Sequence, residues 1–142
     1  MEYFESVAMI SARTSIVWDV ITDTGNLTVW ESGIAAIHGE LRDGGTVRIK
    51  TTDNGGRTVR LRVRQIPGEA MTLTSGPPLG LRKRIRTFTL APRDGRTRLT
   101  VTEEYSGPLA RLLRASNAGT ARNLDELVGA VTKRAELLDR SF

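Results

Sequence analysis

The sequence predicts an α+β fold in which an antiparallel sheet packs against one long C-terminal helix. From residue 34 to residue 106 no helical period survives, and turn signals recur at short intervals that allow only antiparallel neighbours. These turns are Asp43-Gly44-Gly45, Asn54-Gly55-Gly56, Pro67-Gly68 and Asp94-Gly95. From Pro108 to Arg140, apolar residues recur at helical spacing instead: Leu124, Leu127, Val128, Val131, Ala135 and Leu138. We expect the sheet to cover this apolar stripe.

Size and composition fit one domain spanning residues 1–142, because 142 residues with 39% hydrophobic content can bury a core. The net charge of +5 attracts polyanions only weakly. Cysteine is absent and His38 is the single histidine, so we expect no disulfide, no metal site and no cofactor. Met1 to Val7 is too polar for a signal peptide, and no apolar run reaches ~18 residues, so we expect a cytoplasmic protein without membrane insertion. No pattern indicates an oligomeric state.

The chain before the sheet region predicts one strand and two small helices. Phe4 to Ile10 alternates as a strand does, and Thr14 or Ser15 is placed to cap a short helix that ends near Asp23. The apolar face of that helix consists of Ile16, Val17, Val20 and Ile21. Asn26 to Trp30 then predicts a second short turn or helix.

Two segments interrupt the regular pattern. Pro77 to Gly80 predicts a longer, stiffer link between strands. Ser116 to Gly119 weakens the C-terminal helix, because polar side chains compete for its backbone and glycine costs ~1 kcal/mol. This segment is either a kink or a tolerated irregularity.

The hairpin around Asp94-Gly95 fixes which side chains share a face. Simple pairing sets Leu90 opposite Leu99 and Phe88 opposite Val101 on the buried side. The threonines Thr87, Thr89, Thr100 and Thr102 form a ladder on the other side. The same register sets Arg86 opposite Glu103 and Arg84 opposite Tyr105, facing inward, which predicts a polar, partly wet cavity at that end. The alternative is a bulge near Arg86 that turns the arginines outward.

The hairpin around Pro67-Gly68 separates an apolar face from a basic one. Its inward set is Val59, Leu61, Val63, Met71 and Leu73, and its outward set continues onto the preceding strand as Arg48, Lys50, Arg60, Arg62 and Arg64. We interpret the basic set as a solvated face that protects the sheet edge, with phosphate contact as the alternative. Because no aromatic residue interleaves with these charges, we do not expect nucleic acid as a partner.

The sequence offers few groups for catalysis. There is no paired-carboxylate pattern, nucleophile elbow or phosphate-binding loop. His38 is expected at the surface or rim, with an inward general acid or base as the alternative. Glu103, Tyr105 and Arg86 are the candidates for proton transfer, although Glu–Arg pairs are also common structural elements. Of the tryptophans, Trp18 is expected in the core, and Trp30 either lines a cavity mouth or packs in the core.

Several segments resemble one known family. Ala12 to Trp18, followed by Asp23 and Trp30, resembles the "Ala-Pro … Val-Trp … Asp … Trp" opening of the polyketide cyclase/dehydrase branch of the START-like (SRPBCC) superfamily. The similarity continues through a late hairpin and the C-terminal helix: Phe88, Leu90, Pro92, Gly95, Thr97, Leu99, Thr100, Tyr105, Gly107, Leu109, Leu112, Leu113 and Lys133-Arg134-Ala135-Glu136. Arg13 departs from the usual proline, which affects only a helix start.

The resemblance implies a helix-grip fold, in which a curved antiparallel sheet of about seven strands wraps around the C-terminal helix, with two short helices after the first strand. This superfamily includes lipid or hormone carriers, polyketide aromatase/cyclases and chaperone-interacting domains built on one cavity, and no family-wide catalytic set can be transferred. We therefore expect a hydrophobic small molecule as ligand. A polyketide cyclase/dehydrase-type enzyme is the first alternative, and a protein- or nucleic-acid-interaction module using the basic convex face is the second. The expected cavity residues are Trp30, Leu61, Met71, Leu73, Arg84, Arg86, Phe88, Glu103, Tyr105, Leu113 and Leu124.

Overall fold

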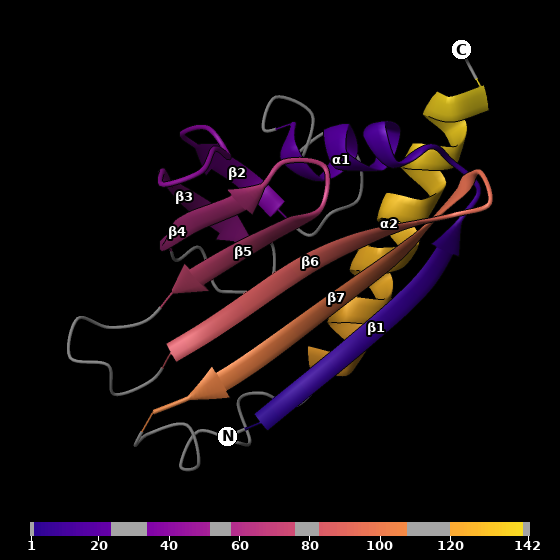
Figure 1. The fold of residues 1–142 in the computed structure, drawn as a ribbon. Helices are drawn as coiled ribbons and strands as arrows, with labels where there is room; N and C mark the ends of the chain where they lie inside the picture. Colours follow the sequence, from indigo (N-terminus) through magenta and orange to yellow (C-terminus); the bar gives the residue numbers. More distant parts are fainter. Residues whose placement is uncertain (1, 24–33, 52–57, 76–82, 108–119, 141–142) are drawn as a thin grey trace.

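A computed structural model of the chain describes residues 2–23, 34–51, 58–75, 83–107 and 120–140 (Figure 1). Its elements follow the order β1 (Glu2–Ile10), α1 (Thr14–Thr22), β2 (Ile34–His38), β3 (Thr46–Thr51), β4 (Thr58–Ile66), β5 (Ala70–Ser75), β6 (Lys83–Arg93), β7 (Arg96–Ser106) and α2 (Thr120–Arg140). The strands form one 7-stranded sheet in the order β1-β7-β6-β5-β4-β3-β2, and every neighbouring pair is antiparallel. The predicted α+β helix-grip architecture is confirmed.

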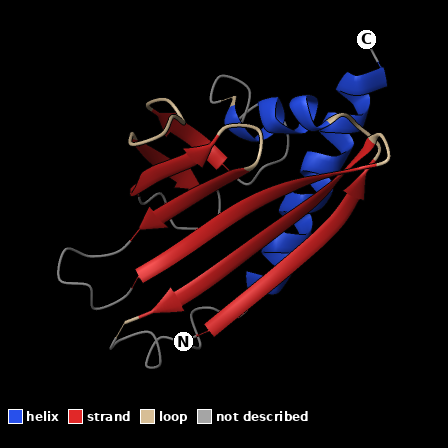
Figure 2. Cartoon of the chain, in the orientation of Figure 1, coloured by secondary structure: helices blue, strands red, loops and turns tan. Residues whose placement is uncertain are grey.

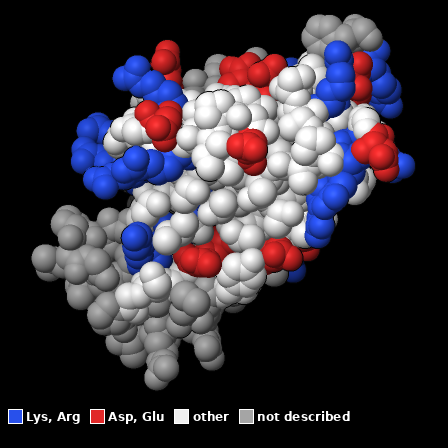
Figure 3. Space-filling model, in the orientation of Figure 1, with Lys and Arg blue, Asp and Glu red and all other residues white. Residues whose placement is uncertain are grey.

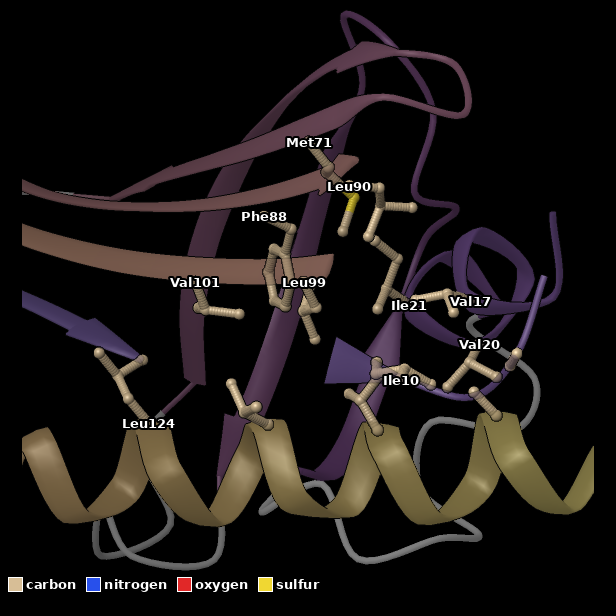
Figure 4. Close-up of a cluster of buried hydrophobic side chains, with 14 of the residues drawn as sticks. Ile10, Val17, Val20, Ile21, Met71, Phe88, Leu90, Leu99, Val101 and Leu124 are labelled. Carbon is tan, nitrogen blue, oxygen red and sulfur yellow. The ribbon is translucent and has the colours of Figure 1, made fainter. Parts of the chain in front are cut away.

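The C-terminal helix lies against one face of the sheet, behind the strands in the view of Figure 2. It packs mainly on β1 and α1 and also touches β7. The predicted apolar stripe is confirmed: Leu124, Val128, Val131 and Ala135 are buried, and Leu127 and Leu138 pack partly buried against the same cluster. Figure 4 shows side chains of the sheet, including Phe88, Leu99 and Val101, pointing toward the helix. Hydrophobic burial between the two layers therefore holds the fold together.

The β6–β7 hairpin has the register that its turn chemistry predicts. Asp94 and Gly95 both have positive φ, at 50° and 80°, as the tight turn of a two-residue hairpin requires. Pairing then runs without a break from Arg93 opposite Arg96 to Lys83 opposite Ser106. The predicted bulge alternative near Arg86 is therefore wrong.

The start of α1 differs from the expectation. The N-cap residue is Arg13, which makes no side-chain cap hydrogen bond, so neither Thr14 nor Ser15 caps the helix. The Thr97 hydroxyl donates to the Ala12 carbonyl at 2.8 Å and lies 3.1 Å from the Thr14 hydroxyl, which must then be the donor of that second bond. The Thr14 side chain thus ties the helix to β7 instead of capping it.

The rest of α1 agrees with the prediction. Val17, Val20 and Ile21 are buried, Ile16 and Trp18 pack partly buried on the core, and the helix ends with Asp23 as its C-cap.

Four predicted features lie outside the described residues: the short helix at Asn26 to Trp30, the turn at Asn54-Gly55-Gly56, the link at Pro77 to Gly80 and the kink at Ser116 to Gly119.

Candidate functional site

Most of the apolar residues expected to line a cavity lie on the inner face of the sheet. Leu61, Met71 and Phe88, on β4, β5 and β6, are buried in the same hydrophobic cluster as Leu124 of α2. Leu73 packs partly buried against that cluster. The structure thus brings these residues together on the side of the sheet that faces α2. Trp30 and Leu113 lie outside the described residues.

A charged cluster interrupts this apolar face where β6 begins and β7 ends. Arg86 pairs opposite Glu103, and Arg84 opposite Tyr105, in the predicted inward register. The Glu103 side chain is only 1% exposed, whereas those of Arg84 and Arg86 are 39% and 22% exposed. One carboxylate oxygen, Oε1, accepts from both arginines: from Arg84 Nε and, at 3.0 Å, from Arg86 Nη2. Both guanidinium groups therefore reach from a more exposed position to one buried carboxylate.

Arg86 is held in a less polar environment than an ordinary surface arginine. Burial lowers the pKa of its guanidinium, and the neighbouring Glu103 carboxylate opposes this shift by favouring the charged form. Its Nε atom is buried and has no hydrogen-bond partner among the residues that the structure describes. Buried polar groups are nearly always hydrogen-bonded, so this unused donor requires an explanation.

Aromatic side chains border the cluster toward β1. Tyr105 is buried, and its ring meets that of Phe4 edge to face, with 6.2 Å between centroids and 85° between planes. The Arg84 guanidinium carbon lies 5.9 Å from the centroid of the Tyr105 ring, within the range of a cation–π contact. Phe4 was not among the expected cavity residues. Alternation along the first strand could have placed it inward, but nothing in the sequence assigned β7 as its neighbour.

The outer face of the sheet carries the predicted basic set. Arg48, Lys50, Arg60, Arg62 and Arg64 are all exposed. His38 is also exposed and lies opposite Arg48, away from Glu103, which agrees with the expected surface or rim position. An open depression on this face is lined by His38, Gly39, Thr46, Arg48 and Arg60.

Polar contacts that the sequence did not reveal fasten α2 to the start of the chain. The Ser6 hydroxyl donates to Asp125 Oδ1 at 2.6 Å, the Ser11 backbone N–H donates to Glu136 Oε2 at 2.8 Å, and Arg13 Nε donates to Asp139 Oδ1 at 2.8 Å. These side chains belong to segments far apart in the chain, so no local motif predicts them. These contacts position the helix, and none of them involves Arg86 or Glu103.

The part of the chain that the structure describes contains neither a metal-binding cluster nor a membrane-spanning helix. No group of three or more histidine, aspartate or glutamate side chains there is arranged to hold a metal ion. None of the described helices combines the length and the apolar character needed to cross a membrane.

Comparison with known proteins gives a consistent fold. No curated protein matches the sequence. A crystal structure of a protein from Mesorhizobium loti superposes with a TM-score of 0.75 at 17% identity, covering 99% of both chains. One from Nitrosomonas europaea gives 0.77 at 15% identity, covering 99% of this chain and 97% of that one. The di-domain ARO/CYC StfQ from the steffimycin biosynthetic pathway gives 0.74 at 13% identity, covering 96% of this chain and 51% of that one.

Because their sequence identities to this chain are low, these structures show a likeness of fold alone. A family model adds evidence from the sequence itself. The model described as "Polyketide cyclase / dehydrase and lipid transport" matches residues 1–136, nearly the full length. The order of strands and helices and the motifs at Ala12 to Trp18 and in the β6–β7 hairpin agree with that match. The chain therefore belongs to the polyketide cyclase/dehydrase and lipid transport family.

Proposed function

We propose that the protein binds a hydrophobic small molecule, lipid-like or polyketide-like, between the inner face of the sheet and the C-terminal helix. The observation that carries this proposal is the combination of a broad apolar face with one charged cluster at its end, in which Arg84 and Arg86 contact the buried Glu103. Ligand sites for small molecules typically combine apolar walls with a few placed polar groups. Leu61, Met71 and Phe88 would supply the wall.

The buried Arg86 Nε supports a specific orientation of the ligand. A buried donor without an acceptor costs about 1–3 kcal/mol. An oxygen at the polar end of the ligand would satisfy this donor and recover part of that cost. The apolar remainder would gain about 25 cal/mol for each Å² of surface removed from water. The ligand would therefore lie with its polar end at β6 and β7 and its apolar part along the sheet.

Native mass spectrometry of the protein purified from its own host tests this proposal. We expect an added mass that extraction with organic solvent removes. Leu73→Trp should abolish it by filling the space beside the apolar wall, because Leu73 is only partly buried there. Leu137→Trp is the matched control, since Leu137 is 50% exposed on α2. A folded wild-type protein that never carries an added mass and takes up no apolar probe would contradict the proposal.

A polyketide cyclase/dehydrase-type reaction is the second candidate. The observation in its favour is the proximity of a carboxylate, a phenol and a guanidinium, since Glu103, Tyr105 and Arg86 share the inner face of β6 and β7. Glu103 would accept a proton from the substrate, and Tyr105 or Arg86 would stabilise the oxygen on which negative charge develops.

Kinetics separate the two candidates. For an enzyme, Glu103→Gln and Tyr105→Phe should each lower kcat for a polyketide-like substrate by roughly 100-fold or more, the usual contribution of a general acid or base. Binding of the same compound should change much less. If turnover of an identified substrate is unchanged in both variants, these residues do not carry the chemistry.

A further inference from the structure

The outward positions of β3 and β4 carry cations, threonines and one isoleucine, and no acid. These positions are Thr46, Arg48 and Lys50 on β3, and Thr58, Arg60, Arg62, Arg64 and Ile66 on β4, all of them exposed. We call Arg48, Lys50, Arg60, Arg62 and Arg64 the basic face. Figure 3 shows one group of basic side chains at the left of the view, on the β3 and β4 side, with some acidic side chains beside it, and a second basic group at the right edge. The surface between the two groups, over the middle of the sheet, is largely uncharged. The basic face is therefore one of two separate concentrations of positive charge, and the other includes Arg93, Arg96 and Arg98 at the turn end of β6 and β7.

The cations of the basic face repel one another. Arg48 on β3 lies directly opposite Arg60 on β4. Like charges directly opposite on neighbouring strands are destabilising. Within the described part of the chain, none of these cations forms an ion pair, whereas Arg13, Arg84 and Arg86 all do. The basic face thus lacks internal compensation for its charge and is suited to an external anion.

An open depression lies among the cations of the basic face. The open depression there is lined by the side chains of Arg48, Arg60, His38 and Thr46 together with Gly39. Guanidinium groups bind phosphate oxygens through paired N–H donors, and a threonine hydroxyl can add a further donor. A phosphate-sized group seated there would meet both arginines.

An exposed apolar side chain stands at the end of the basic row on β4. Ile66 is 58% exposed and points to the same side of the sheet as Arg64, immediately before the Pro67-Gly68 turn. An apolar residue beside cations is the combination that peripheral membrane proteins use, because the cations approach lipid headgroups while the apolar side chain enters the acyl boundary. A nucleic acid backbone would offer Ile66 no such gain.

We propose that the basic face and Ile66 dock the protein reversibly on the surface of a membrane rich in anionic phospholipids. The charge of the face complements such a surface, and the interaction requires no spanning segment. Single-stranded nucleic acid fits less well, because no aromatic side chain occupies an outward position of β3 or β4 on which bases could stack. This site lies on the opposite side of the sheet from the proposed ligand site and does not depend on it.

Vesicle co-sedimentation at low ionic strength tests the docking surface. Wild-type protein should sediment with vesicles of phosphatidylcholine containing one third phosphatidylserine, should not sediment with pure phosphatidylcholine vesicles, and should be released by salt. The triple variant R48Q/R60Q/R62Q should lower the partition coefficient on the order of a hundredfold, since each basic residue near an anionic surface contributes several-fold. Ile66→Ser should lower it by a smaller factor.

The matched control removes the same charge from another place. Arg93, Arg96 and Arg98 are exposed at the turn end of β6 and β7, so R93Q/R96Q/R98Q has the same net charge as the first triple variant. It should partition within about twofold of wild type, because charges beyond a Debye length from the bilayer contribute little. Circular dichroism should show the first triple variant melting at the wild-type temperature or above, because its substitutions remove repulsion.

Three outcomes would overturn the proposal. Equal loss in both triple variants would show that net charge alone drives the binding. Unchanged partition of R48Q/R60Q/R62Q would show that other residues meet the membrane. Failure of the wild type to bind anionic vesicles, combined with tight RNA binding that the first triple variant abolishes, would assign the basic face to nucleic acid.

Discussion

At the scale of single residues, Glu103 is the one buried charged residue among those that the structure describes. Its carboxylate is buried, and the two arginines that reach it are both more exposed. Removing a carboxylate from water costs several kcal/mol, which only good geometry and full hydrogen bonding offset. A buried pair of this kind is weak evidence for stability in itself, since apolar side chains of similar volume often serve as well. Its retention on the inner face of the sheet fits the role in ligand orientation proposed above.

Removal of the Glu103 charge alone should be costly. In Glu103→Gln, the Arg86 guanidinium remains partly buried without its counter-charge, and we expect a loss of about 2–4 kcal/mol in the free energy of unfolding. Urea denaturation at neutral pH measures this loss. The double variant Arg86→Met with Glu103→Leu should recover most of it. Arg84→Met, at a more exposed position, should cost no more than about 1 kcal/mol.

Asp139 gives a pH dependence whose sign follows from its contacts. The hydrogen bond from the Arg13 side chain is the main cause that holds the pKa of Asp139 below its ordinary value of 3.8. A depressed folded-state pKa stabilises the protein above the unfolded-state value, and this contribution is lost as pH falls through the folded-state pKa. Wild type should therefore be more stable than Asp139→Asn at neutral pH, and urea denaturation should show the difference shrinking well below pH 3.8. A constant difference would exclude this linkage.

At the scale of elements, the β6–β7 hairpin fixes the register that creates the charged cluster. Its turn places Asp94 and Gly95 in the left-handed region, which suits the right-handed twist of the flanking strands. Every inward pair, including Arg86 with Glu103, follows from that starting point by the alternation of strand side chains. A slip of one residue would turn the cluster to the outer face.

Gly95→Ala tests the backbone requirement of this turn. A Cβ at Gly95 would meet nothing within 4 Å, so any loss must come from the positive φ of 80° and not from a clash. We expect a loss of about 1–2 kcal/mol in the free energy of unfolding, measured by urea denaturation. Asp94→Asn is the control and should change stability by less than about 0.5 kcal/mol, because asparagine tolerates this conformation well. Equal effects of the two substitutions would argue against a backbone origin.

Features of the fold that depend on neighbouring residues could be predicted from the sequence, whereas contacts between distant segments could not. The hairpin register could be predicted because Asp94-Gly95 and the strands that it joins lie together in the chain, and the Arg86–Glu103 pair followed from it. The contacts at the start of α1 could not be predicted, because the Thr14 hydroxyl bonds to Thr97, 83 positions away. The Ser6–Asp125 bond joins residues 119 positions apart. The position of Phe4 beside Tyr105 likewise depends on the pairing of β1 with β7, which no turn motif encodes.

At the scale of the whole molecule, sheet and helices share one hydrophobic cluster. Leu124 of α2, Leu99 of β7 and Val17 of α1 all belong to it and are fully buried. Because each layer covers the apolar face of the other, we expect neither to be stable alone. The charged cluster at one end and the basic face outside occupy separate sides of this common framework.

Leu124→Ala should destabilise the whole chain and not the helix alone. Deleting a fully buried leucine side chain costs about 2–5 kcal/mol. Far-ultraviolet circular dichroism and tryptophan fluorescence should show the same lowered midpoint in urea. Leu137→Ala, at a half-exposed position of the same helix, should change stability by less than about 0.5 kcal/mol. Separate midpoints for the two probes in Leu124→Ala would indicate that the chain does not unfold in one cooperative step.

The pairing of β1 with β7 has a consequence for the order in which the chain folds during synthesis. β1 is made before the other described strands, yet its neighbour in the described sheet is β7, which brings Tyr105 opposite Glu2. Each strand from β3 to β7 can pair with the strand completed just before it. β1, in contrast, stays unpaired until a partner about a hundred residues later in the chain has been synthesised. The α2 helix, which packs on β1, emerges later still. β1 is therefore among the last of the described strands to be paired, although it is synthesised before them, and a chain interrupted before β7 offers it no partner among these strands.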